Sequence, residues 1–309
     1  MLPFEPIEVS AWVEAGRAER AIRVLSDPRL HPTRIGSDDA RTRRALADRF
    51  EAEAFDDLRR LAVATDGTLW IDRAAPLDAP DAEALEAEDI AIAAGSCTVP
   101  FLIAVPQCEI APSFRRTAAG SAMLGIAEAF GRVEVVQAAV SVSTSERVGE
   151  GLRMAAAAAI SLIGPVEQVS ALGARDGTVA ATVLGARGFG TLAVGTSVDA
   201  TSCTLVGEGG VATVGTGMVA WRRKDGTWVE ETRLEPDGDE PIVRTLLEAE
   251  KPVGRDGRRA PLAAANRRRR LRVAALVDTI ALATRTGGLE NVAALLRGFG
   301  LDPDHLGDA

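Results

Sequence analysis

The sequence predicts an α/β protein with two domains: a Rossmann-like parallel-sheet domain, followed by an α+β domain with a large, mainly antiparallel open sheet. Strand-like and helix-like segments alternate over the first 110 residues, which is typical of βαβ units. Most segments between residues 133 and 232 are instead β-forming, with few helical runs between them. A length of 309 residues also favours two domains over one.

The first domain is predicted to span residues 1–110. β-forming runs at residues 7–13, 33–36, 68–71 and 101–105 indicate buried strands. Helices are expected at about residues 17–25, from 37 through 50, from 55 onward and at 81–93. The stretch Ser37-Asp38-Asp39 supplies capping side chains for the second of these helices. Strands separated by helices in this way predict a parallel sheet.

The second domain is predicted to span residues 111–309. Its expected strands lie at residues 133–143, 166–172, 178–186, 190–198 and 211–221, and Asp176-Gly177 and Asp225-Gly226 are hairpin-turn signals. One alanine-rich helix is expected at residues 153–163. A closing helix is expected at about residues 263–283, ending before Gly287-Gly288.

The charge and the cysteines restrict the class of protein. A formal net charge of −9 argues against nucleic acid or an anionic membrane as the main partner, because both require a basic surface. Cys97, Cys108 and Cys203 are odd in number and lack C-x-x-C spacing, which favours a reducing compartment. The chain opens without a signal-peptide pattern, and its longest apolar run, residues 154–163, is too short to span a bilayer. We therefore expect a cytoplasmic protein.

The order of segments resembles the Gfo/Idh/MocA family of oxidoreductases over nearly the whole chain. Residues 34–58 resemble that family's second strand, helix and following Asp-Leu segment. The stretch Gly164-Pro165-Val166 resembles the segment after its sugar-site helix, and residues 205–210 resemble its Gly-x-x-Gly strand turn. The resemblance implies NAD(P)-dependent oxidation of a sugar-like or other small hydroxy or oxo substrate. It also implies a homo-oligomer formed through the C-terminal sheet, and a small-molecule ligand in the cleft between the domains.

The loop after the first strand departs from a dinucleotide-binding fingerprint. G-x-G-x-x-G places glycines where the chain turns tightly and where the backbone approaches the pyrophosphate. Here only the middle glycine, Gly16, is present, and Glu14 and Glu19 stand at the outer positions. Ala15, Gly16 and Arg17 are thus the remnants of a cofactor loop, and Arg17 could pair with a phosphate. We expect weak or absent dinucleotide binding and no cofactor, with NAD(P) as the cofactor if the enzyme is active.

Ser37 follows the predicted second strand, at the position that contacts the adenosine ribose in dinucleotide sites. With Arg41, Arg43 and Arg44 it would suit a 2′-phosphate. The simpler interpretation is a capped helix with a solvated basic face.

The catalytic residues that the resemblance implies are missing. They are a lysine in a Glu-Lys-Pro motif after a Rossmann strand, and an Asp-x-x-x-His arrangement on the second-domain helix. The strand expected at residues 101–105 ends in Val105 where the lysine belongs, and no lysine precedes Lys224. The predicted helix offers Arg153, Met154 and the alanines 155–159 in place of the acid and histidine.

Other chemistry finds no support in the sequence, and we assign no catalytic and no metal-binding residue. Glu250-Lys251-Pro252 lies far downstream of the Rossmann context, so we interpret it as coincidence. His31 and His305 are expected in a loop and in the tail, and offer no metal-ligand spacing. The run of arginines at residues 267–270 and 272 is the only basic cluster, and it is interpreted as a solvated helix start or an ion-pairing surface.

Two functional hypotheses follow. The first is a protein of this fold that has lost the hydride-transfer site and acts as a structural, regulatory or ligand-binding protein. The alternative is an active NAD(P)-dependent oxidoreductase with an atypical cofactor loop and different catalytic acids, for which Glu109, Glu128 and Glu150 are candidates.

Overall fold

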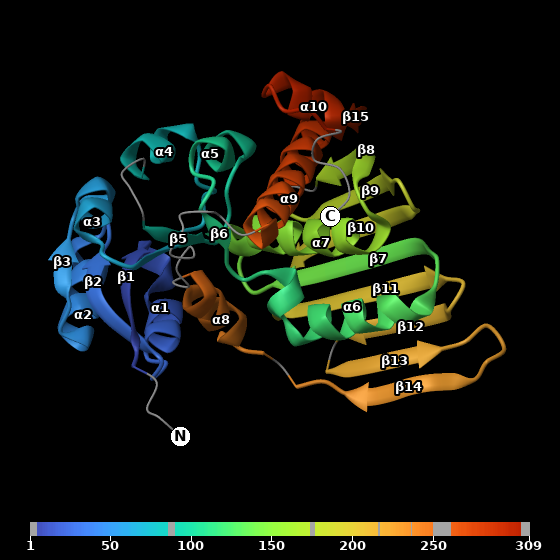
Figure 1. The fold of residues 1–309 in the computed structure, drawn as a ribbon, viewed down its shortest axis with the longest axis horizontal. Coiled ribbons are helices and arrows are strands. Elements are labelled where there is room, and N and C mark those ends of the chain that lie inside the picture. The colour runs from blue at the N-terminus through green and yellow to red at the C-terminus, as the bar shows by residue number, and fades with distance from the viewer. Residues whose placement is uncertain are drawn as a thin grey trace. The chain divides into compact units, whose positions relative to one another are not determined.

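The computed structural model describes residues 5–85, 90–173, 177–215, 217–235, 237–249 and 261–303, with side chains from 266 onward in the last range. The chain divides into two compact units (Figure 1). The first contains Met1–Pro112 and Gly238–Arg267, and the second contains Ser113–Asp237 and Arg268–Ala309. The predicted second domain was continuous from residue 111, whereas the structure assigns residues 238–267 to the first unit.

The first unit is built on a six-stranded sheet whose order is β3-β2-β1-β4-β5-β6. All its strand pairs are parallel, which confirms the predicted Rossmann-like fold class. The strands are β1 (Ile7–Val13), β2 (Leu30–Gly36), β3 (Glu53–Phe55), β4 (Thr68–Asp72), β5 (Ala91–Ala94) and β6 (Glu109–Ile110). The helices that connect them are η1 (Ala15–Arg17), α1 (Ala18–Leu25), α2 (Ala40–Phe50), α3 (Leu58–Ala64), α4 (Ala79–Leu85) and α5 (Val99–Ala104).

Two predicted secondary-structure elements of this unit are wrong. The run expected as a strand at residues 101–105 lies in helix α5 and its C-terminal cap. Thr98 caps this helix by accepting a hydrogen bond from the Phe101 amide, and Pro100 fits the first turn because its missing N–H is not needed there. The helix expected at residues 81–93 is described over Ala79–Leu85 as α4, whereas residues 91–94 form β5. Burial within a parallel sheet outweighs the helical preference of those alanines.

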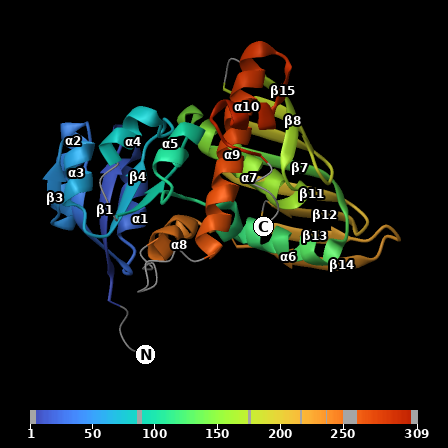
Figure 2. The same cartoon turned by 45° about the horizontal axis from the view of Figure 1, so that its top comes forward.

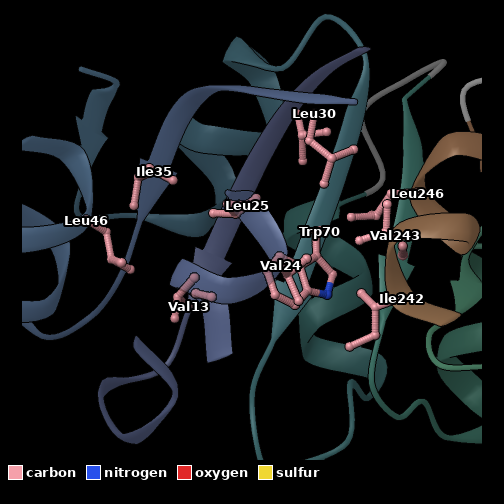
Figure 3. Close-up of a cluster of buried hydrophobic side chains, with 14 of the residues drawn as sticks. Val13, Val24, Leu25, Leu30, Ile35, Leu46, Trp70, Ile242, Val243 and Leu246 are labelled. Atoms are coloured by element: carbon pink, nitrogen blue, oxygen red, sulfur yellow. The ribbon is translucent and has the colours of Figure 1, made fainter. Parts of the chain in front are cut away.

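A helix from late in the chain completes the core of the first unit. Helix α8 (Glu240–Ala249) buries Ile242, Val243 and Leu246 in a cluster with side chains of β1, α1 and β4 (Figure 3). Trp70 of β4 lies beside them and is 1% exposed. The return of the chain to this unit therefore follows from burial of the apolar face of α8.

The second unit is built on a nine-stranded sheet whose order is β14-β13-β12-β11-β7-β10-β9-β8-β15. Only the β7–β10 pair is parallel among the described strands of this sheet, so the prediction of a large, mainly antiparallel sheet is confirmed. The strands are β7 (Val133–Val142), β8 (Val166–Gly173), β9 (Val179–Gly185), β10 (Phe189–Thr196), β11 (Ala200–Gly207), β12 (Gly210–Gly215), β13 (Met218–Arg222), β14 (Trp228–Arg233) and β15 (Leu289–Asn291).

Helices cover one face of this sheet (Figures 1 and 2). Gly151 of helix α7 lies so close to the side chain of Val194 in β10 that a Cβ would stand 2.8 Å from its methyl group. Close packing of α7 on the sheet therefore requires glycine there. The helices of this unit are η2 (Phe114–Arg116), α6 (Ala118–Phe130), η3 (Ser145–Arg147), α7 (Val148–Ile163), α9 (Pro261–Thr286) and α10 (Val292–Gly298), and α9 begins within the first unit.

One predicted strand of the second unit is wrong. The run at residues 211–221 forms two strands, β12 and β13, and Gly215 and Gly217 take positive φ angles where the chain reverses. The Asp225-Gly226 turn joins β13 to β14 as predicted, while Asp176 lies outside the described residues. Within the described part of the chain, no helix is both long and apolar enough to cross a bilayer.

Candidate functional site

The loop that follows β1 carries the remnants of the dinucleotide fingerprint. Ala15, Gly16 and Arg17 form the 3₁₀ turn η1, which leads directly into α1. Ala15 and Gly16 are exposed, whereas Arg17 is only 7% exposed. This turn stands at the carboxyl edge of the sheet, where β1 ends beside β4 in a pair that aligns Val13 with Asp72. Ligands of open α/β sheets bind at this edge.

Ion pairs close this loop onto the end of β4. Arg17 Nη1 donates to Asp72 Oδ1 at 2.8 Å, and Arg20 Nη1 donates to the same oxygen at 3.3 Å. The Glu14 carboxylate accepts a hydrogen bond of 2.6 Å from the Ala74 amide and lies 3.8 Å from Arg17 Nε. Two guanidinium groups and two carboxylates therefore form a neutral cluster, within which Asp72 is 2% exposed. Glu19 lies outside these contacts and is exposed.

Ser37 lies at the same edge of the sheet, because β1 and β2 are neighbours. Its side chain is fully buried, and its hydroxyl oxygen accepts a hydrogen bond of 3.2 Å from the Asp39 amide. Arg43 donates to the Ser37 carbonyl at 2.7 Å, and Asp39 caps α2 by accepting from the Thr42 amide at 2.7 Å. The contacts of Ser37 and Arg43 are those of a capped helix start, which was the simpler interpretation.

Helix α7 buries charged side chains near its N-terminus. Glu150 and Arg153 are 8% and 3% exposed, and Arg147 Nε lies 3.4 Å from Glu150 Oε2. Arg147 also pairs with Asp199. Burial works against the charge of Arg147, but Glu150 and Asp199 outweigh it and hold the pKa of Arg147 above its usual value. Burial likewise raises the pKa of Asp199, and Arg147 more than offsets this, so that the pKa is lowered overall. Arg147 and Asp199 therefore stay ionised.

The comparisons with known proteins rest on structure alone, since no protein-family model and no curated protein sequence matches the chain. A levoglucosan dehydrogenase in complex with NADH and L-sorbose is similar, with 15% identity, TM-score 0.67, and 92% of this chain and 99% of that chain covered. The WlbA dehydrogenase from Chromobacterium violaceum, in complex with NADH and UDP-GlcNAcA, gives 18% identity, TM-score 0.63, and 94% and 99% coverage. An oxidoreductase from Agrobacterium radiobacter, in complex with NAD+, L-tartaric acid and magnesium, gives 13% identity, TM-score 0.70, and 93% and 99% coverage.

These likenesses span both units. The chain has the Gfo/Idh/MocA fold. The sequence resemblance predicted this fold, and the prediction is confirmed. Sequence identities this low support a shared fold and nothing more. The function of the site therefore has to be inferred from its own residues.

The structure changes which segment would carry the lysine expected of a Gfo/Idh/MocA oxidoreductase. The strand after β4 is β5, and it ends at Ala94, followed by Gly95 and Ser96. Val105, which was predicted to end a strand at the position of the lysine, caps helix α5 instead. The whole segment that spans β5 and α5, residues 90–105, contains no lysine.

The acid–histidine arrangement that the resemblance implies has a counterpart in spacing on α7. Glu150 stands four residues before Met154 on α7, so the two side chains project from one face of the helix. Glu150 and Met154 thus have the spacing of an Asp-x-x-x-His arrangement, with glutamate for the acid and methionine for the histidine. Met154 is 7% exposed and cannot accept a proton at neutral pH. The other candidate acids lie elsewhere: Glu109 in β6, partly buried, and Glu128 in α6, exposed.

The remaining candidate residues that the structure describes form no second site. His31 lies within β2 and is exposed, although we had predicted a loop. His305 and Glu250-Lys251-Pro252 fall outside the described residues. Among the residues that the structure describes, no three His, Cys, Asp or Glu side chains are grouped as a metal site would need. Sequence reasoning missed Asp72, whose signal was a lone carboxylate ending the apolar run of β4.

Proposed function

We propose that this protein is a non-catalytic protein of the Gfo/Idh/MocA fold, which binds no dinucleotide at the β1–α1 loop and serves as a structural or regulatory partner. The observation that carries the proposal is the buried ion pair between Arg17 and Asp72, at the place where this fold would receive a pyrophosphate.

Charge at the loop opposes a pyrophosphate. Arg17 and Arg20 are the cations that could attract it, but Asp72 already accepts hydrogen bonds from both. Glu14 adds a second carboxylate, held in the loop by its bond to the Ala74 amide. At an effective dielectric constant near 20, a carboxylate about 4 Å from a phosphate charge costs about 4 kcal/mol, or about a thousandfold in affinity. The cluster therefore gives a dianionic group no net attraction.

The residues expected to transfer protons support the same conclusion. No lysine precedes Lys224, and Met154 stands where the histidine is expected. A base for hydroxyl oxidation must titrate near neutrality or be tuned to do so. Met154 has no such group, and the alanines that follow it on α7 offer none.

The alternative, an active NAD(P)-dependent oxidoreductase, is favoured by one observation. All three of the similar structures described above carry NADH or NAD+. In this alternative Arg17 would exchange Asp72 for a phosphate, and Glu150 would act as an acid or base.

Calorimetric titration of the full chain with NADH and with NADPH separates the two functions. We expect no binding at millimolar cofactor, in the parent protein and in the matched variant Arg59→Ala, which removes an exposed arginine of α3. The variant Glu14→Gly with Asp72→Asn removes both carboxylates and is expected to gain measurable affinity if their charge is what excludes the cofactor. A micromolar complex with the parent protein would overturn the proposal.

We also propose that the protein is a homodimer formed through the uncovered face of the nine-stranded sheet. Residues paired across neighbouring strands lie side by side on that face, and they form three rows. The first row is apolar: Leu184, Phe189, Val135, Val206 and Val211. The second is small and polar: Ser170, Thr182, Thr191, Gln137, Thr204 and Thr213. The third is Ala180, Ala193, Ala139 and Ser202.

From β8 to β12 none of these rows contains a charged side chain, on a protein whose net charge is −9; beyond β12 the first row continues to Arg222 of β13 and the second to Glu231 of β14. Leu184, Phe189 and Val211 are 47%, 45% and 46% exposed in the single chain. An uncharged face that crosses so many strands is typical of a surface that another subunit covers. Its self-complementary small side chains fit a second copy of the same sheet.

A further inference from the structure

Two neighbouring hollows lie in the second unit, away from the N-terminal turns of α7. The first has a volume of about 740 Å³ and is bounded by α6, the C-terminal end of α7 and the start of β7. The second has a volume of about 530 Å³ and is bounded by the end of α7, β8, α9 and α10. Ala186 and Arg187 line both, so the turn between β9 and β10 forms their common wall. Hollows of this size accommodate small organic ligands.

The first hollow is basic. Arg115, Arg132 and Arg187 line it, together with one carboxylate, Glu128. Over the described part of the chain, the side chains of these three arginines form no ion pair with a carboxylate. Elsewhere in the protein acids outnumber bases, which gives the net charge of −9. The first hollow is therefore positively charged on a protein whose net charge is negative.

The arginine run of α9 adds to this charge. Arg269 is partly buried, and burial together with the nearby positive charges of Arg115 and Arg272 lowers its pKa. Arg272 and Arg297 of α10 line the second hollow, together with one carboxylate, Glu167. Like charges held this close repel one another, and a bound anion removes that repulsion. Guanidinium groups match phosphate oxygens in a bidentate geometry, which makes phosphate the anion they fit best.

The second hollow supplies an apolar wall beside the arginines. Its aliphatic lining consists of Ile160, Val166, Leu276, Val292 and Leu296, with Pro165 and Pro303. A bare phosphate would leave this wall uncovered, whereas an organic phosphate would cover it with its uncharged part.

We infer that the second unit binds a small organic phosphate, with the phosphate against Arg115, Arg132 and Arg187 and the organic part in the hollow between α7, α9 and α10. Arg187 contacts both parts of the ligand. The site is distinct from the β1–α1 loop and from Glu150, so it is independent of the proposed loss of dinucleotide binding.

Calorimetry at low ionic strength tests this site with two probes, inorganic phosphate and phenyl phosphate. We expect both to bind, and phenyl phosphate to bind about tenfold more tightly, because its ring removes apolar surface from water. Arg187→Ala should weaken both probes by about tenfold or more, since it removes a charge-assisted contact. Arg59→Ala changes the net charge equally and should leave both affinities unchanged.

A second variant checks the apolar half of the site. Ala293→Phe fills the second hollow from α10 and should abolish the preference for phenyl phosphate while inorganic phosphate still binds. The inference is overturned if neither probe binds at millimolar concentration, if Arg187→Ala binds as the parent does, or if the two probes bind equally to the parent. Titrating NADH into Arg187→Ala separates this site from the first unit, because binding at the β1–α1 loop would survive that substitution.

Discussion

At the scale of single residues, the buried carboxylate of Asp72 depends on the guanidinium groups beside it. The pair with Arg17 is shielded from water on both sides, with 7% and 2% of the side chains exposed. Without Arg17, Asp72 keeps only the longer contact with Arg20, at 3.3 Å, and weakening a buried pair costs more than losing a surface pair. Stability at this loop is therefore tied to the same contacts that oppose a cofactor.

We expect Arg17→Ala to lower the free energy of unfolding by about 3 kcal/mol, measured by urea denaturation. Adding Asp72→Asn should recover part of that loss, because the buried carboxylate, which Arg17→Ala leaves with Arg20 alone, is then gone. Arg34→Ala breaks an exposed pair with Asp66 and should cost less than about 1 kcal/mol. Equal losses for Arg17→Ala and Arg34→Ala would show that the Arg17 pair has no special role.

Cys97 and Cys108 form a second pair that depends on the fold. Their Sγ atoms are 3.6 Å apart, although the thiols are eleven positions apart in the chain, and both are buried. Hydrogen peroxide is expected to join them: each thiol loses a proton and an electron, a disulfide forms, and two waters are released. Mass spectrometry of tryptic peptides should find a 97–108 link and no link to Cys203, whose burial raises its pKa to about 12. Cross-links to Cys203 would contradict the expectation.

At the scale of elements, helix α8 is essential to the first unit although it lies far away in the sequence. Leu246 is fully buried against the core of that unit. We expect Leu246→Ala to lower the free energy of unfolding by about 3 kcal/mol, through lost burial and a residual cavity. Val63→Ala, on the exposed side of α3, should change it by less than about 0.5 kcal/mol. Chemical denaturation followed by tryptophan fluorescence measures both.

The N-terminal end of α8 is also held by charge. Arg29 Nε donates to Asp27 at 2.8 Å, and Arg29 Nη2 donates to Glu240 at 2.5 Å. These side-chain hydrogen bonds are the main reason that the pKa values of Asp27 and Glu240 lie below their usual 3.8 and 4.5. A lowered carboxyl pKa stabilises the fold above the unfolded-state value, and that contribution is lost as the pH falls through the folded-state value.

The stability difference between the parent protein and Arg29→Met should therefore depend on pH. Because the groups are partly exposed, we expect about 1 kcal/mol at pH 7, decreasing once the pH falls below the usual carboxyl values of 4.5 and 3.8 and lost below the lowered folded-state values. Urea denaturation across this range measures it. A difference that stays constant with pH would show that Arg29 acts through its aliphatic chain alone.

At the scale of the whole molecule, the uncharged sheet face predicts the oligomeric state. Thr191 lies at the centre of that face, between Thr182 and Gln137. Thr191→Arg would place like charges against each other across a two-fold interface and should convert a dimer to monomers in analytical ultracentrifugation. Ala45→Arg, on the exposed side of α2, adds the same charge and should remain dimeric. A monomeric parent protein would contradict the proposed homodimer.

The fold was largely predictable because hydrophobic periodicity and turn residues are local. The β1 run at residues 7–13, the cap region before α2 and the Gly287 end of α9 were all visible as short patterns. The alanine-rich β5 was predicted as a helix and the apolar α5 as a strand. Short apolar runs of this kind have no distinct periodicity, so their tertiary contacts decide which structure they form.

The sequence by itself determined that the loop after β1 departs from the dinucleotide fingerprint. Residues 14–19 alone show the missing glycines and the two added glutamates. Only the tertiary structure decided that Arg17 is buried against Asp72, that α8 returns to the first unit, and that Arg115, Arg187 and Arg272 line adjoining hollows. The physical reason is the same in each case. Composition and periodicity act over a few residues, whereas ion pairs, core burial and cavities depend on groups that meet only once the strands are ordered in the sheet.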